Sequence, residues 1–135
     1  MIRKHTILSV LFFIGCIFTQ AQNIDSLKKV LTRAAEDTNK VNTYIALGRA
    51  YVWSYPDSAL QFLMPALELS RKINYKSGEI RSLQYLGESL ALKGNYSKAL
   101  EMSLEAVELT EALDHRLMVA THSTAGNVFY YSGDY

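Results

Sequence analysis

The sequence has little cysteine, little proline and almost no excess of charge of one sign. Its 135 residues include one Cys and two Pro, and 14 Lys and Arg nearly balance 13 Asp and Glu, giving a formal net charge of +1. A single Cys excludes an intrachain disulfide scaffold, and a near-neutral chain lacks the positive field that attracts nucleic acid or an anionic membrane surface. The apolar content of 49% is too high for a disordered tail. We therefore expect one packed globular domain with no nucleic-acid partner.

The N-terminal segment has the outline of a secretory signal peptide. A basic pair that begins at Arg3 precedes an unbroken apolar or small run over 7–18, and small side chains follow. Cleavage after Ala21 would remove residues 1–21 and leave Gln22 as the mature start. We therefore predict export, to the periplasm or the cell surface.

Two alternatives remain open for this segment. Cys16 lies inside it, and lipidation at Cys16 would leave an unusually short apolar region. Retention as a membrane anchor is disfavoured because twelve helical residues span only about 18 Å of a hydrocarbon core about 30 Å thick. We therefore expect contact with a membrane only through this N-terminal segment or through a transmembrane helix further downstream in the full-length protein.

An internal repeat organises the rest of the chain. Glycines recur every 39 residues, in the sets Gly48, Gly87, Gly126 and Gly94, Gly133. Small and apolar residues in a second block recur every 40 residues, as in Ala59 with Ala99 and Ala66 with Ala106. The one-residue difference falls near Pro56, which indicates a turn, because deletions are tolerated in loops. Each repeat is therefore predicted to be two segments joined by a short turn.

Within each segment apolar residues recur at intervals of three and four, which predicts helices and an all-α fold. We predict a capping helix and linker over 22–38, with the helix at about 25–35, and then helices over 39–53, 56–72, 77–92, 96–112 and 115–131. The domain covers 39–135, with repeats at about 41–79, 80–118 and, incomplete, 119–135.

Glycine and proline inside predicted helices need an explanation. A mid-helix Gly costs about 1 kcal/mol relative to Ala, so we expect close helix contacts at these positions, for example between Gly87 and Ala99 or Ala106. Pro65 cannot bond to the carbonyl of Gln61, which predicts a kink there.

The residues Leu47, Gly48, Tyr51, Ala59 and Ala66, and their equivalents in the second repeat, resemble the tetratricopeptide repeat family. This resemblance implies a right-handed helix-pair solenoid. The period of 39 departs from the usual 34 or so, the closing Pro is absent, and Tyr44, Leu83 and His122 stand where the family often has Trp. The third repeat is truncated after its first helix, which predicts marginal stability or self-association through that open face.

The segments are also similar to the exported N-terminal regions of bacterial tetratricopeptide sensor histidine kinases and transcription regulators. The alternative function is therefore the sensor region of a membrane-bound two-component kinase or regulator, seen as a fragment. An apolar stretch of about 20 residues followed by an output module downstream in the gene would favour this alternative.

The resemblance implies a ligand groove on the concave face, formed by the first helix of each pair, and a protein or peptide ligand. Its candidate residues are polar or aromatic: Asn42, Arg49, Trp53, Arg81, Gln84, Glu88, Ser123, Asn127 and Tyr130. Because Ile45 and Arg49 replace the Lys and Asn of the family's carboxylate clamp, we do not expect recognition of a peptide C-terminus by that route. The two Arg could meet an acidic ligand, or they could be solvated or paired with Glu88 and its neighbours. Trp53 could anchor a ligand or cover a turn.

Nothing in the sequence indicates catalysis. There is no nucleophile elbow, phosphate-binding loop or paired carboxylate pattern. His115 and His122 lie seven residues apart without further ligands, so we expect structural histidines and no metal site. We predict that this segment is not an enzyme and has no cofactor, and a hydrolase that uses groove residues is the least favoured hypothesis.

Overall fold

The computed structural model describes residues 24–111 and 115–133, and it is all-helical over these residues, with no strand. A helix over 24–33 precedes five others: α2 (Thr38–Tyr51), α3 (Pro56–Lys72), α4 (Lys76–Leu92), α5 (Tyr96–Glu111) and α6 (His115–Ser132). The all-α prediction is confirmed, and the predicted helix bounds lie within about two residues of those in the structure. The predictions for the signal segment, Cys16 and the side chain of His122 fall outside what the structure describes.

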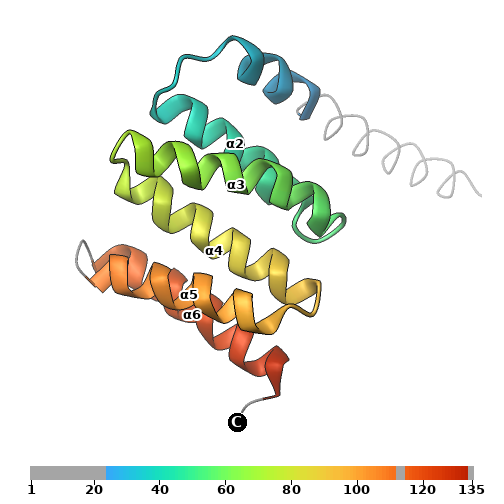
Figure 1. Ribbon diagram of the computed structural model, residues 1–135, viewed down its shortest axis with the longest axis vertical. Helices are drawn as coiled ribbons and strands as arrows, with labels where there is room; N and C mark the ends of the chain where they lie inside the picture. The colour runs from blue at the N-terminus through green and yellow to red at the C-terminus, as the bar shows by residue number, and fades with distance from the viewer. Residues whose placement is uncertain (1–23, 112–114, 134–135) are drawn as a thin grey trace, which may run out of the picture.

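The helices stack side by side in two layers (Figure 1). Each helix packs against the next along the chain, and α4 also packs against both α2 and α6. The layer of α2, α4 and α6 therefore lies against a second layer that contains α3 and α5. The helix over 24–33 lies beside α2, where Lys28 Nζ is 5.8 Å from the centre of the Tyr51 ring.

Local signals set the helix ends. Asp37 begins α2, since its carboxylate accepts hydrogen bonds from the backbone N–H of Asn39 at 2.9 Å and of Lys40 at 3.0 Å. At the end of α4, Gly94 has φ +75° and the Asn95 N–H donates to the Leu90 carbonyl, which closes a Schellman turn. Pro56 occupies the first turn of α3, as the sequence predicts. Helix α3 continues through Pro65 to Lys72, and the kink at Gln61 stays a prediction.

Small residues form the seam between the two layers. Ala59, Ala66, Ala99 and Ala106 are fully buried, and Leu63 and Leu86 share one core cluster with Ala59 and Ala106. On α5, Ser103 is buried and Leu104 is exposed. Large side chains are excluded from this side of α5 because α4 approaches it closely.

The expected close contacts are present at two of the three repeated glycines. A Cβ atom on Gly48 would lie 2.5 Å from Leu63 Cδ2, and one on Gly87 would lie 2.6 Å from Ser103 Oγ and 3.2 Å from the Ala99 carbonyl oxygen. The prediction of Ala99 as a partner of Gly87 is confirmed, whereas Ala106 is not among its nearest neighbours. A Cβ atom on Gly126 would meet nothing within 4 Å.

A charge cluster joins α3, α4 and α5. Glu79 is buried, and its two carboxylate oxygens accept hydrogen bonds from Arg71 Nε at 2.9 Å and Lys76 Nζ at 2.8 Å. Arg71 also pairs with Glu105 on α5. Burial alone would raise the pKa of Glu79, but the hydrogen bonds and charges of Lys76 and Arg71 outweigh it and hold that pKa below its usual value.

Candidate binding face

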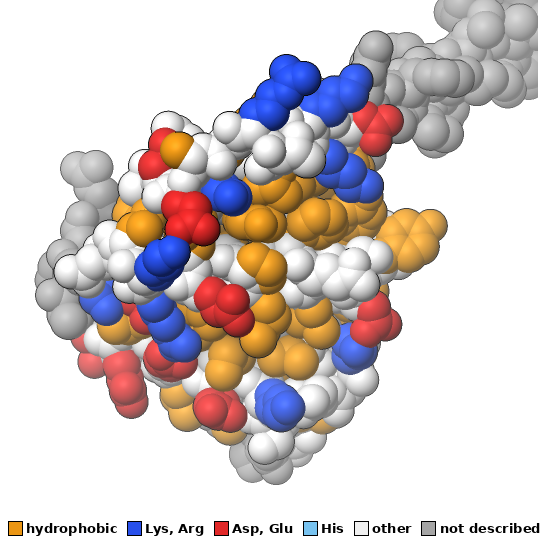
Figure 2. All heavy atoms as spheres, turned by 45° about the horizontal axis from the view of Figure 1, so that its top comes forward, with side chains coloured by type: hydrophobic (Ala, Val, Ile, Leu, Met, Phe, Trp, Pro, Cys, Tyr) orange, Lys and Arg blue, Asp and Glu red, His pale blue; other side chains and the backbone are white. Residues whose placement is uncertain are grey.

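The layer of α2, α4 and α6 carries the candidate groove residues, and two hollows lie on it. We call them the arginine hollow and the glutamate hollow, after the charged residues that line them. Figure 2 is tilted from the view of Figure 1, in which α3 and α5 lie in front, and on the face that it shows hydrophobic side chains gather in the middle with most charged side chains around them.

The arginine hollow lies between the helix over 24–33, α2 and α4, and has a volume of about 580 Å³. It is lined by Ile24, Leu27, Ile45, Ala46, Arg49, Ala50, Trp53, Ser54 and Arg81. Its two charged residues, Arg49 and Arg81, are both positive. The hollow therefore offers apolar contact together with planar guanidinium donors suited to a carboxylate.

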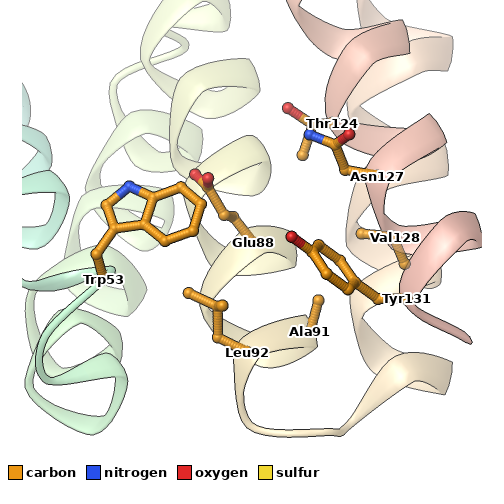
Figure 3. Close-up of a pocket in the computed structure, with 8 residues that line it drawn as sticks. All are labelled: Trp53, Glu88, Ala91, Leu92, Thr124, Asn127, Val128 and Tyr131. Carbon is orange, nitrogen blue, oxygen red and sulfur yellow. The ribbon is translucent and has the colours of Figure 1, made fainter.

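The glutamate hollow lies between α4, α6 and the turn after α2, and its volume is smaller, about 30 Å³. It is lined by Trp53, Glu88, Ala91, Leu92, Thr124, Asn127, Val128 and Tyr131. In Figure 3 the rings of Trp53 and Tyr131 stand on opposite sides of Glu88 and Leu92. Of the described residues that line this hollow, only Glu88 is charged.

Trp53 borders both hollows. Helix α2 ends at Tyr51, so Trp53 lies in the turn that follows the helix. Helix α4, in contrast, continues to Leu92, two residues beyond Leu90, which is the equivalent of Tyr51. The side chain is 69% exposed. It therefore does not cover the turn by burying itself there, and its ring is open to a ligand.

Glu88 is partly buried, and no hydrogen bond or ion pair joins its carboxylate to the residues that the structure describes. Burial raises the pKa of this carboxyl. Of the alternatives open for the two Arg, pairing with Glu88 is not observed among the described residues. Arg81 Nη1 instead donates a hydrogen bond to Asn42 Oδ1 at 3.1 Å, and Arg49 makes no ion pair or hydrogen bond within the described part of the chain.

Gln84 is 8% exposed, and its Nε2 atom has no hydrogen-bond partner in the described structure. It lies three residues after Arg81 and four before Glu88, so that the three side chains follow one face of α4. A buried donor without a partner costs free energy.

The remaining candidates lie outside the hollows. Ser123 is exposed, and Tyr130 is 65% exposed with its ring centre 5.7 Å from that of Tyr131. The residues at the equivalent positions of the two earlier repeats, 39 and 78 residues before these two, are buried. They are covered because α4 packs against α2 and α6 packs against α4. The buried equivalents of Ser123 and Tyr130 are Ile45, Gln84, Val52 and Ala91.

The structure adds residues that the candidate set does not contain. Ile24 and Leu27 line the arginine hollow from the helix that the sequence analysis treats only as a cap. Their spacing of three is an available signal, because it places both on one side of a helix. Thr124, Val128 and Tyr131 line the glutamate hollow from α6. The apolar pattern within one helix does not predict which other helix it packs against, so the contributions of 24–33 and of α6 to the hollows could not be predicted from the sequence.

Over residues 24–111 and 115–133, no group of three His, Cys, Asp or Glu is placed to hold a metal ion. No helix in this part of the chain is both long enough and apolar enough to span a membrane. What the hollows offer is aromatic surface, two guanidinium groups, one carboxylate and amide groups.

Comparisons with protein-family models, with curated proteins and with solved structures found no match to this chain.

Proposed function

We propose that the chain is an exported scaffold that binds a peptide or protein on the α2–α4–α6 face. The fold that we propose for it is a right-handed helix-pair solenoid of the tetratricopeptide type. No catalytic step is part of this function.

The repeat supports the proposed fold. Residues 39 or 40 positions apart in the sequence occupy matching places in successive helix pairs, as Gly48 and Gly87 do against α3 and α5. Ser70 and Thr110 also match, since each is buried and donates to the carbonyl four residues earlier. One packing solution therefore serves both pairs.

One observation carries the proposed binding function. Residues from four helices and one turn form two hollows on the same face, and three of their polar groups, on Arg49, Glu88 and Trp53, are not used in bonds within the described chain. Trp and Arg are the residues most often found as anchors of protein interfaces. A surface of this kind suits a ligand that lies across the helices.

Selection of random phage-displayed peptides on the purified protein tests this function. We expect saturable binders whose affinity falls about tenfold or more in Trp53→Ala, because the ring supplies contact area to both hollows. Trp53 is the only Trp in the chain, so binding to the unchanged protein should also alter its fluorescence.

The matched control is Met64→Ala, which removes an exposed apolar side chain from α3, outside the binding face. Selected peptides should bind this variant as they bind the unchanged protein. Peptides that bind Trp53→Ala and the unchanged protein equally, or the absence of any saturable binder, would refute the proposed function.

Export is a separate part of the proposal, supported by the basic pair and apolar run at the N-terminus. Expression of the complete reading frame in a bacterial host should yield a periplasmic protein whose intact mass corresponds to a chain that begins at Gln22. A protein that retains Met1, or that carries lipid on Cys16, would contradict cleavage after Ala21.

A further inference from the structure

We infer that the α2–α4–α6 face selects an extended peptide with an acidic side chain for the arginine hollow and, about three residues away, a basic side chain for the glutamate hollow. This inference rests on the proposed function and specifies the chemistry of its ligand. Between the two charges, the peptide would place an apolar or aromatic side chain on Trp53.

Charge separation between the hollows is the first argument. Among the residues that the structure describes, the charged ones that line one hollow are Arg49 and Arg81, and the only charged one that lines the other is Glu88. Arg49 and Glu88 have no ion-pair partner within the described chain, and Arg81 is held by Asn42, a neutral residue. An acidic group in the first hollow and a basic group in the second would each meet an unneutralised partner.

Glu88 gives the stronger half of this argument. Its carboxyl is partly buried beside Leu92 and the Trp53 ring. Burial raises the pKa of this carboxyl, and no hydrogen bond from the described residues compensates for the lost hydration. A Lys or Arg side chain of a ligand would restore the lost interactions of the carboxylate and could also stack on the Trp53 ring. A second acidic group there would be repelled.

The spacing follows from the repeat. Arg49 and Glu88 are 39 residues apart and hold equivalent positions on α2 and α4, which pack against each other. Packed helices have axes about 8–10 Å apart, and an extended chain advances about 3.3 Å per residue. A peptide that crosses from α2 to α4 therefore spans this distance in about three residues.

Selection on a charge-exchanged protein tests the inference. Peptides selected on the unchanged protein should be enriched in an acidic and a basic residue about three positions apart, in one order along the chain. Peptides selected on the double variant Arg49→Glu, Glu88→Arg should no longer carry the pair in that order, because Arg81 is then opposed by a carboxylate in the first hollow and the second hollow has lost its carboxylate. Binders that depend on Trp53 but show no such pair would overturn the inference and leave the proposed function in place.

The role of the Glu88 carboxylate can also be tested with single variants of the protein and one selected peptide. Its dissociation constant should rise about tenfold or more in Glu88→Gln, whereas Glu101→Gln, at an exposed position on α5, should bind as the unchanged protein does. Loss of fold does not explain a weaker Glu88→Gln, because removing a partly buried, unpaired charge should leave the melting temperature unchanged or slightly higher. Equal binding by Glu88→Gln and the unchanged protein would refute a role for the carboxylate.

Discussion

Replacement of Gly48 by Ala should lower the free energy of unfolding, although Ala is the better helix former. The added Cβ would lie 2.5 Å from Leu63 Cδ2, and Leu63 is fully buried among core side chains. Overpacking of this kind costs about 1–3 kcal/mol, against a gain in helix propensity of about 1 kcal/mol. Chemical denaturation should therefore show a net loss of up to about 2 kcal/mol.

Gly126 is the matched control, because it occupies the same repeat position and its added Cβ would meet nothing within 4 Å. Gly126→Ala should raise the free energy of unfolding by up to about 1 kcal/mol, since only the propensity term remains. Gly87→Ala should fall between the two, because Ser103 Oγ can rotate away but the Ala99 carbonyl oxygen cannot. Equal effects at Gly48 and Gly126 would show that close packing is not the reason for the repeated glycine.

Replacement of Glu79 by Gln should lower the free energy of unfolding by about 2 kcal/mol at about pH 7. The carboxylate is buried and bonded to Arg71 and Lys76, and hydrogen bonds to charged groups contribute about 1.5–3 kcal/mol each. The loss is smaller than for a fully buried pair because Arg71 and Lys76 are 47% and 44% exposed. Arg71 retains Glu105 in the variant. The melting temperature should fall by about 10 °C.

The difference between Glu79→Gln and the unchanged protein should depend on pH. Because the pKa of Glu79 is lower in the folded than in the unfolded state, its contribution is complete above the unfolded value, about 4.3, and is lost as pH falls through the folded value. Melting curves of the two proteins should therefore approach each other as the pH falls below about 4.3. A difference that does not decrease there, or equal stability at about pH 7, would contradict this account. Glu101→Gln is the control with no expected effect.

The sequence by itself determines where the helices lie. The intervals of three and four among apolar residues, Pro56 at the start of α3 and Gly94 after α4 are local signals, and each depends on a few neighbouring backbone groups. The 39-residue period adds that successive helix pairs pack alike. These signals are short-range or repeated, so a single sequence contains them in full.

The tertiary structure alone decides what each equivalent residue does. Gly48 and Gly126 match in the sequence, yet only Gly48 has a helix packed on it. Arg81 bonds to Asn42 and not to Glu88, and the helix over 24–33 lines a hollow in addition to flanking α2. These outcomes depend on which side chains from distant segments meet. The helical period gives the direction of a side chain around its own helix, but the neighbour that it meets is set by the packing of the layers.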